Sequence, residues 1–538
     1  MQSRGRCGAP VWWRVGAAWS APARRGRAGI GIMAILLLSA CAVGPDFKAP
    51  EPPPVSGYTP EPHPAATVAS GGAGGQAQKF VAGRDIPGEW WKVFHNKDLD
   101  GLIAVALEAN PNLQAAQASL WQAKENLYAA TGKLLPTVDA NASVTRQQFS
   151  PAEFGGTGAP FIFNLFQSTV NVAYAPDVFG GTRRQIEATA ATAAYQRFQL
   201  EATYLTLTSN VVTAVVQEAS LRGQIAATRE IIKTETDQLG LVRQQFDVGA
   251  ATRTDVLTQE SEVATQQATL PPLQKQLEQQ HHVLLALTGQ FPDVRLRERV
   301  TLASLHLPRD LPLTLPSQLV QQRPDVRSAE AQLHQASAQI GVAVAARLPQ
   351  FNLTADYGSN AAALASLFTP SSIVWSVAAS GTQPIFHGFT LLHQERAARA
   401  AYDVSEAQYR NTVVTAFQNV GDALRALQFD AATLKAQAAA LHAASETLDL
   451  ARGQYKLGAI AYLTLLNSQR SYAQARLAVV QAQAARFADT AALFAALGGG
   501  WWNRVDVLTN PLSPEDSDAI TATDLVAGAH GIKTETRP

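Results

Sequence analysis

Cysteine and charge are both scarce in this chain. It has two cysteines in 538 residues, Cys7 and Cys41, so the long region that follows them cannot hold a disulfide framework. Charged residues make up 16% of the chain, against roughly a quarter in an average soluble domain. Hydrophobic residues make up 46%, which excludes disorder of the whole chain. The formal net charge is zero, so the basic surface of a nucleic-acid binder is not expected.

The first 40 residues have the order of a secretory signal: a basic stretch, an apolar stretch, then small residues. They hold six arginines and no acid, and residues 28–45 are uncharged. The end of this segment, Leu38-Ser39-Ala40-Cys41, resembles the bacterial lipobox, in which the cysteine is acylated and becomes the mature N-terminus. We therefore expect a signal peptide over 1–40, with S-diacylglycerol and N-palmitoyl groups on Cys41.

Removal of this segment changes the charge balance. Basic residues fall from 43 to 37 against 43 acidic ones, a net charge of −6, and Cys41 is then the only thiol. Ala42 follows it, and in lipoproteins of this type the absence of Asp at that position goes with sorting to the outer membrane. The alternative is a retained transmembrane anchor, because 18 uncharged residues just span a bilayer.

Composition marks both ends of the mature chain as irregular. Residues 48–80 are rich in Pro, Gly, Ala and Ser, which predicts a flexible linker over 41–80 behind the acylated N-terminus. Residues 506–538 are polar, with Pro511, Pro514 and mixed charges, so we expect a flexible tail over 501–538.

Between these ends the chain repeats itself. Pro111 and Pro136 bracket a helical pattern that returns 213 residues later between Pro324 and Pro349. Further on, the pattern around the glycine at 249 returns 209 residues later. Two copies of one structural unit, 81–290 and 291–500, are the interpretation.

Each copy changes its hydrophobic period twice. Alternation with period two predicts β-hairpins over 136–180 and 349–387, with loops near 150–166 and 360–371. Helical periodicity then predicts long helical hairpins over 182–288 and 389–497. Residues 182–247 and 389–456 lack proline, and each spans about 100 Å if helical at ~1.5 Å per residue.

Repeats of seven and glycine positions describe the hairpins further. Apolar residues recur every seven positions in the second hairpin, which predicts coiled-coil packing: Val413, Val420, Leu427, Leu434, Leu441 and Leu448. Gly249 and Gly458 predict reversals between antiparallel helices, and Gly289 and Gly498 predict the ends of the returning helices. Pro271-Pro272 predicts a break in the first returning helix.

Four strands per chain raise the question of what covers them. Helices that run about 100 Å away from the strands cover little of a sheet, so lipid becomes the natural partner of its apolar face. A membrane barrel needs at least about eight strands. A trimer would supply twelve strands together with six helical hairpins, enough to close a helical tube beneath the barrel.

Three motifs then point to a family. Residues 88–94 (GEWWKVF), 315–326 (LPSQLVQQRPDV) and 496–501 (ALGGGW) resemble the outer-membrane efflux lipoproteins, the nodulation-protein-T branch of the outer-membrane factor family of resistance-nodulation-division systems. The resemblance runs from Cys41 to about Trp502. It implies a mixed α/β membrane protein: a trimeric outer-membrane β-barrel with four strands per chain, continued by a long periplasmic α-helical barrel. An equatorial region would form from segments near 80–110 and 290–323 and the end of the last helix.

An enzymatic interpretation finds little support. His281-His282 are adjacent, and His387 and His393 are six apart, which fits neither a helical zinc pair nor a catalytic triad. The motif Arg323-Pro324-Asp325 is explained by helix initiation, with Pro at the first helical position and Asp in the first turn. We expect no catalytic residue, no metal site and no cofactor other than the lipid on Cys41.

The resemblance also assigns roles to the two reversals. It implies that the turns at Gly249 and Gly458, with Tyr455, are periplasmic tips where a periplasmic adaptor docks and the tunnel closes. Leu463 and Asn467, with Thr464, match an apolar ring and a ring that is acidic in related channels. Thr254 and Asp255 match a polar latch, although Ile460 stands where some relatives have a latching Arg. The alternative is that these are ordinary tip residues.

The resemblance therefore implies a passive duct in the cell outer membrane. It would export drugs or other small toxic compounds as a homotrimer, together with a periplasmic adaptor and an inner-membrane resistance-nodulation-division pump. The alternatives are a type I secretion duct and a non-channel coiled-coil surface lipoprotein. The last of these predicts uninterrupted helix and no strands.

Overall fold

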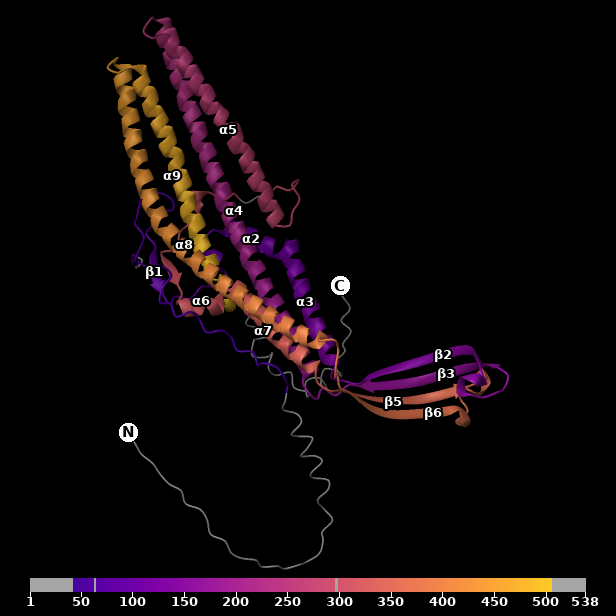
Figure 1. Ribbon diagram of the computed structural model, residues 1–538. Helices are drawn as coiled ribbons and strands as arrows, with labels where there is room; N and C mark the ends of the chain where they lie inside the picture. Colours follow the sequence, from indigo (N-terminus) through magenta and orange to yellow (C-terminus); the bar gives the residue numbers. More distant parts are fainter. Residues whose placement is uncertain (1–41, 62–63, 296–298, 506–538) are drawn as a thin grey trace, which may run out of the picture.

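The computed structural model describes residues 42–61, 64–295 and 299–505 (Figure 1). The predicted signal peptide, the acylation of Cys41 and the tail beyond residue 505 lie outside these ranges. Within the described ranges, no helix carries an apolar stretch long enough to cross a lipid bilayer.

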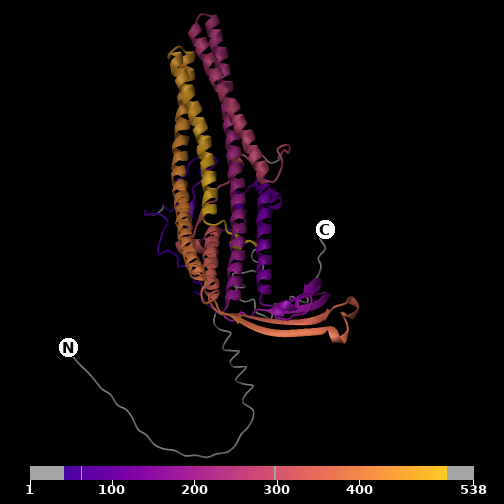
Figure 2. The ribbon, with the colours of Figure 1, turned by 45° about the vertical axis from the view of Figure 1, so that its right-hand side comes forward.

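The two predicted repeats are present as two matching sets of helices. The first set is α3 Pro111–Gly132, α4 Gly181–Asp247 and α5 Arg253–Leu287, and the second is α7 Pro324–Ala345, α8 Thr390–Lys456 and α9 Tyr462–Ala496. Corresponding helices have the same length: 22, 67 and 35 residues. At ~1.5 Å per residue, α4 and α8 are each about 100 Å long. Both views show the hairpins α4–α5 and α8–α9 as long rods ending in separate tips (Figure 2).

The strands of both repeats form one antiparallel sheet. β2 Thr137–Phe149, β3 Phe161–Tyr174, β5 Gln350–Ala361 and β6 Ile373–Thr382 pair in the order β2-β3-β5-β6. The repeats join where β3 pairs with β5. The sheet leaves the helices at the end opposite to the tips (Figure 1). Its presence rules out the interpretation as a non-channel coiled-coil lipoprotein, which predicted no strands.

The first hairpin loop is shorter than expected. β3 begins at Phe161, so residues 161–166, expected in the loop, are strand. The reason is aromatic packing across the hairpin end: the ring of Phe161 lies 5.3 Å from that of Phe149 and 5.8 Å from that of Phe163.

The two faces of the sheet differ in chemistry. One face carries exposed apolar side chains, among them Val144, Trp375 and Val377. On the other, a row of hydrogen bonds crosses all four strands: Asn141 donates to Asn171 (2.9 Å), Asn171 to Asp356, and Ser376 to Asp356 (2.8 Å). A sheet with one apolar and one hydrogen-bonded polar face is suited to lie between lipid and water.

An equatorial region surrounds the middle of the helices, as expected. β1 Lys79–Ala82 pairs in parallel with β4 Asp310–Leu313, and α2 Lys97–Ala109 and α6 Pro316–Gln322 lie in the same segments. The core here is aromatic: Trp90, in a short 3-10 helix, is 1% exposed and its ring stacks on Phe494 of α9 at 5.7 Å. Phe94 and Phe487 are equally buried.

The predicted break at Pro271-Pro272 is wrong. Helix α5 runs through both prolines from Arg253 to Leu287. Each proline removes the hydrogen bond to the carbonyl four residues earlier, at Gln267 and Ala268. Both of these residues are exposed, so water can satisfy the freed carbonyls, and packing against α4 holds the helix on its course.

The segment predicted as a flexible linker is in fact packed along the helices. Arg486 of α9, 1% exposed, donates to the carbonyls of Gly74 (3.2 Å) and Gln76 (2.9 Å). The hydroxyl of Tyr58 donates to the carbonyl of Thr314 (3.0 Å). Composition misled the prediction because a chain rich in Gly and Pro also exposes many backbone carbonyls, which buried arginines can bind.

The tail begins later than predicted. Residues Trp501–Asn503 form a 3-10 helix, and the indole N–H of Trp501 donates to the carbonyl of Gln322 (2.6 Å). Arg504 forms an ion pair with Glu201 of α4 (2.8 Å), with both side chains at least nine-tenths buried. The chain up to Arg504 therefore belongs to the folded body.

Candidate functional site: the helical tips

Two glycines shape the reversals. Gly249 and Gly458 adopt left-handed backbone angles, φ +77° and +72°. After each, the next residue closes the helix: Ala250 N–H donates to Gln245 (2.7 Å) and Ala459 N–H to Gln454 (2.9 Å). No atom lies within 4 Å of where a Cβ would stand at either glycine. The left-handed conformation alone therefore requires glycine here.

The start of α5 uses the residues that the resemblance assigned to a latch. Thr252 and Asp255 form a capping box: Asp255 accepts from the N–H (2.8 Å) and hydroxyl (2.7 Å) of Thr252. The carbonyl of Thr254 accepts the hydroxyl of Thr258 (2.8 Å). Within one chain these residues serve their own helix, and a latch between chains stays a prediction.

The residues matched to the aperture share one face of α9. Leu463 is 62% exposed, and Thr464 and Asn467 are exposed as well. Their spacing of one and four residues places them side by side on a helix. On the opposite face, Leu465 and Leu466 are buried. The open face can line a lumen formed by several chains, and this role stays a prediction.

A buried polar network joins the two helical hairpins near the tips. Tyr462 of α9 donates its hydroxyl to Oε1 of Gln259 in α5. The Gln259 amide donates to the carbonyl (3.0 Å) and carboxyl (2.7 Å) of Glu235 in α4. All three are less than a tenth exposed. Burial is the main cause that raises the pKa of Glu235.

Two further contacts reinforce this connection. Arg470 of α9 binds Glu262 of α5 through Nε (3.0 Å) and Nη2 (2.6 Å). Tyr455, at the end of α8, donates to Gln245 of α4 (3.1 Å), and its ring lies 5.7 Å from that of Tyr462. Tyr455 is therefore a contact between the hairpins as well as a residue of the tip.

Sequence reasoning singled out Tyr455 but missed the rest of this network. Its polar members sit in helices rich in Gln and Glu, where most such side chains face solvent. The tyrosines that bind Gln245 and Gln259 come from the other repeat, about 200 residues away in sequence. The nearest signal was Tyr462, an aromatic residue at the first position of α9.

The Arg323-Pro324-Asp325 motif lies at the other end of α9. Pro324 is the first residue of α7, and Arg323 binds Asp325 (2.6 Å) and the carbonyl of Ala496 (2.8 Å). The guanidinium thus satisfies a free carbonyl at the end of α9 while it orders the start of α7. This supports the structural role expected from the sequence. Among the described residues, no group of three His, Cys, Asp or Glu side chains is arranged to hold a metal.

Comparison with known proteins adds to this geometry. The family described as outer membrane efflux protein matches residues 102–290 and 315–499. The pyoverdine export outer membrane protein OpmQ of Pseudomonas aeruginosa is 30% identical over 87% of this chain and 96% of its own length. The antibiotic efflux pump outer membrane protein ArpC of Pseudomonas putida is 28% identical over 89% of this chain and 96% of its own.

Solved structures of outer-membrane channels have the same fold as this chain. The open state of the Neisseria gonorrhoeae MtrE outer membrane channel superposes with a TM-score of 0.74 at 27% identity, over 86% of this chain and 99% of that one. The Vibrio cholerae outer membrane protein VceC gives 0.71 at 26% identity, over 77% of this chain and 100% of that one. The chain belongs to the outer membrane efflux protein family and is an outer-membrane channel component whose helices form the periplasmic part of the duct.

Proposed function

We propose that three copies of this chain form a passive exit duct for drugs or other small toxic compounds. The duct takes its cargo from an inner-membrane resistance-nodulation-division pump through a periplasmic adaptor that grips the tips. Lipid on Cys41 and the apolar face of the strands hold it in the outer membrane. Selectivity rests mainly on the pump.

One observation carries this proposal: helices about 100 Å long end in the tips on one side, while a two-faced sheet leaves the helices at their opposite end. Four strands are too few to close a barrel, since at least about eight are needed. Three copies supply twelve strands with lipid on the apolar face and water on the polar face. The same copies supply six helical hairpins around a common axis.

The chemistry of the relatives supports small-molecule cargo. Those proteins are described as outer-membrane parts of antibiotic and toluene efflux pumps and of pyoverdine export. Export of a small dye from cells separates this function from a type I secretion duct, which would pass a protein. Cells lacking the gene should accumulate ethidium, and the wild-type gene should restore its export. Unchanged ethidium export after deletion, with loss of a secreted protein, would refute the proposal.

The anchor has its own test. Cys41→Ser should abolish incorporation of radiolabelled palmitate, because the thiol that accepts the diacylglycerol is absent. Insertion of the strands should persist, since the sheet itself spans the membrane. Palmitate that remains on the Ser variant, with normal processing, would contradict acylation at this position.

A further inference from the structure

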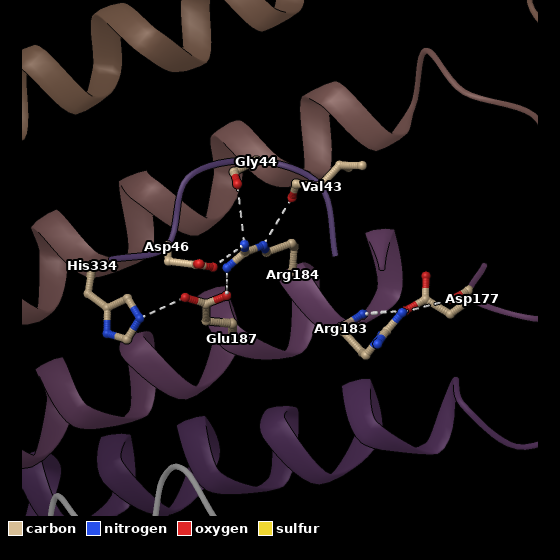
Figure 3. Close-up of polar contacts among 8 residues, drawn as sticks. All are labelled: Val43, Gly44, Asp46, Asp177, Arg183, Arg184, Glu187 and His334. Carbon is tan, nitrogen blue, oxygen red and sulfur yellow. Dashed lines mark hydrogen bonds and ion pairs between the residues drawn. The ribbon is translucent and has the colours of Figure 1, made fainter. Parts of the chain in front are cut away.

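Residues 42–47 lie between the first turns of α4 and the second half of α7, in a groove lined by Gly180, Arg184 and Gly341 (Figure 3). Arg184 of α4, whose side chain is 7% exposed, points into this segment. Its guanidinium donates to the carbonyls of Val43 (3.1 Å) and Gly44 (3.4 Å) and to the carboxylate of Asp46 (2.6 Å). The N–H of Val43 in turn donates to the carbonyl of Phe179 (3.1 Å).

Three glycines allow the backbone of the segment to lie this close to both helices. A Cβ on Gly44 would stand 2.4 Å from the Cα of Gly341 in α7, and Gly44 has φ +98°. A Cβ on Gly341 would stand 2.9 Å from the carbonyl oxygen of Val43. A Cβ on Gly180 would stand 2.6 Å from the Cα of Ala42. The segment and the groove therefore meet backbone against backbone, with no room for a side chain.

A second group of side chains holds Arg184 in place. Glu187 accepts from Nη1 of Arg184 (2.7 Å), and its other oxygen lies 2.9 Å from Nε2 of His334 (Figure 3). The ring of His334 stacks on Phe47 with centroids 4.3 Å apart. All three nitrogens of Arg184 thus donate, and Glu187 is the partner that does not belong to the segment. Its charge-assisted hydrogen bonds to the carbonyls and carboxylate of the segment favour the docked state.

We propose that this groove is a binding site for the backbone of residues 42–47, and that it fixes the point at which the chain behind Cys41 joins the folded body. The consequence for a lipid rests on the proposed acylation of Cys41, whereas the docking itself does not. The ligand is a short peptide that bends at the glycine in its third position and carries an acid two residues later. The groove turns the segment into a strap with a fixed position.

Docking strongly restricts the positions that the N-terminal end of this segment can reach, compared with a free linker. A flexible linker over residues 41–80 would let its end wander by about 35 Å, on the scale of ~5–6 Å times the square root of its length. In the docked strap, by contrast, Ala42 is held beside Gly180. Gly180 immediately precedes α4, where the chain arrives from β3. The strap therefore holds Ala42, the residue that follows Cys41, at the junction of strands and helices.

Tryptic cleavage after Lys48 in the purified full-length protein tests the docking, because a protease needs an undocked chain on both sides of the bond. Gly44→Val adds a side chain where the backbone of Gly341 leaves no room, so cleavage should become about tenfold faster or more. Gly71→Val is the matched control. Gly71 lies outside the docked strap, in the same Gly- and Pro-rich region, has no positive φ and has no atom within 4 Å of its Cβ position. It should be cut at the wild-type rate.

Two more variants separate the possible causes. Arg184→Met removes the donors but keeps the length of the side chain, and should also speed cleavage, with helix content checked by circular dichroism. Cys41→Ser should leave cleavage slow, so loss of palmitate labelling and loss of docking are distinguishable. Rapid cleavage of the wild type, or equal rates for Gly44→Val and Gly71→Val, would overturn the proposal.

Discussion

Tyr462→Phe should loosen the tips without disturbing the rest of the molecule. The hydroxyl of Tyr462 donates to Gln259, whose side chain is fully buried, so its removal leaves Oε1 of Gln259 without a partner. An unsatisfied buried acceptor costs about 1–3 kcal/mol. We take ~1.5 kcal/mol per protomer, which corresponds to roughly a tenfold increase in the local opening of α9 at the tip.

Hydrogen exchange on purified protein measures this opening. Amides of the first turns of α9, from about residue 465 to 472, should exchange roughly tenfold faster in Tyr462→Phe. Amides of the equatorial region around Trp90 and Phe494 provide the internal reference and should not change. In planar bilayers the same variant should open more often, because the second hairpin is less firmly held to the first.

A double-mutant cycle shows whether the hydrogen bond is responsible. In a Gln259→Ala background the phenol has lost its partner, so the added effect of Tyr462→Phe should shrink by about 1 kcal/mol. Additive effects of the two substitutions would refute the reasoning. So would unchanged exchange at the start of α9 in Tyr462→Phe alone.

Three further predictions follow from the structure. Gly458→Val should keep the protein in the outer membrane but abolish efflux, because valine strains the left-handed turn. Gly453→Val, on the exposed face of α8, is the control. Normal drug tolerance of cells with Gly458→Val would contradict this prediction. Asn467→Asp should create or strengthen block by trivalent cations added from the periplasmic side, and Leu463→Ser should raise basal conductance; if bilayer recordings show neither, these residues do not form the constriction. The pKa of Asp430 is raised to about 7, mainly by burial. A hydrogen bond to the carboxyl of Asp489 and repulsion between the two charges raise it further. The protonated Asp430 therefore stabilises the fold at a pH below the ordinary carboxyl pKa, and this stabilisation is lost as pH rises through about 7. In Asp430→Asn, the free energy of unfolding should vary less with pH, by on the order of 1 kcal/mol. An unchanged pH profile of unfolding would contradict this prediction.

Local chemistry explains why so much of the fold is readable in the sequence. A long stretch without proline and apolar residues with a period of seven indicate the helices of 67 residues, and alternation with period two indicates the strands. Glycine at positions 249 and 458 marks the turns because only that residue adopts a positive φ without strain. Each of these signals depends on neighbours in the chain, so no knowledge of the tertiary structure is needed.

The sequence failed where the outcome depended on distant partners. Pro271 signals a break locally, but α5 packs against α4 and stays continuous, and the carbonyls that the prolines leave free belong to exposed residues. Residues 41–80 have the composition of a free linker, yet Arg184 and Arg486, more than 100 residues away, bind their backbone. The link between the tips likewise depends on Gln259, whose partner Tyr462 lies in the other repeat. Periodicity determined the elements of this protein, and only their packing decided which buried polar groups would meet, because a hydrogen bond across two helices leaves no local trace in either one.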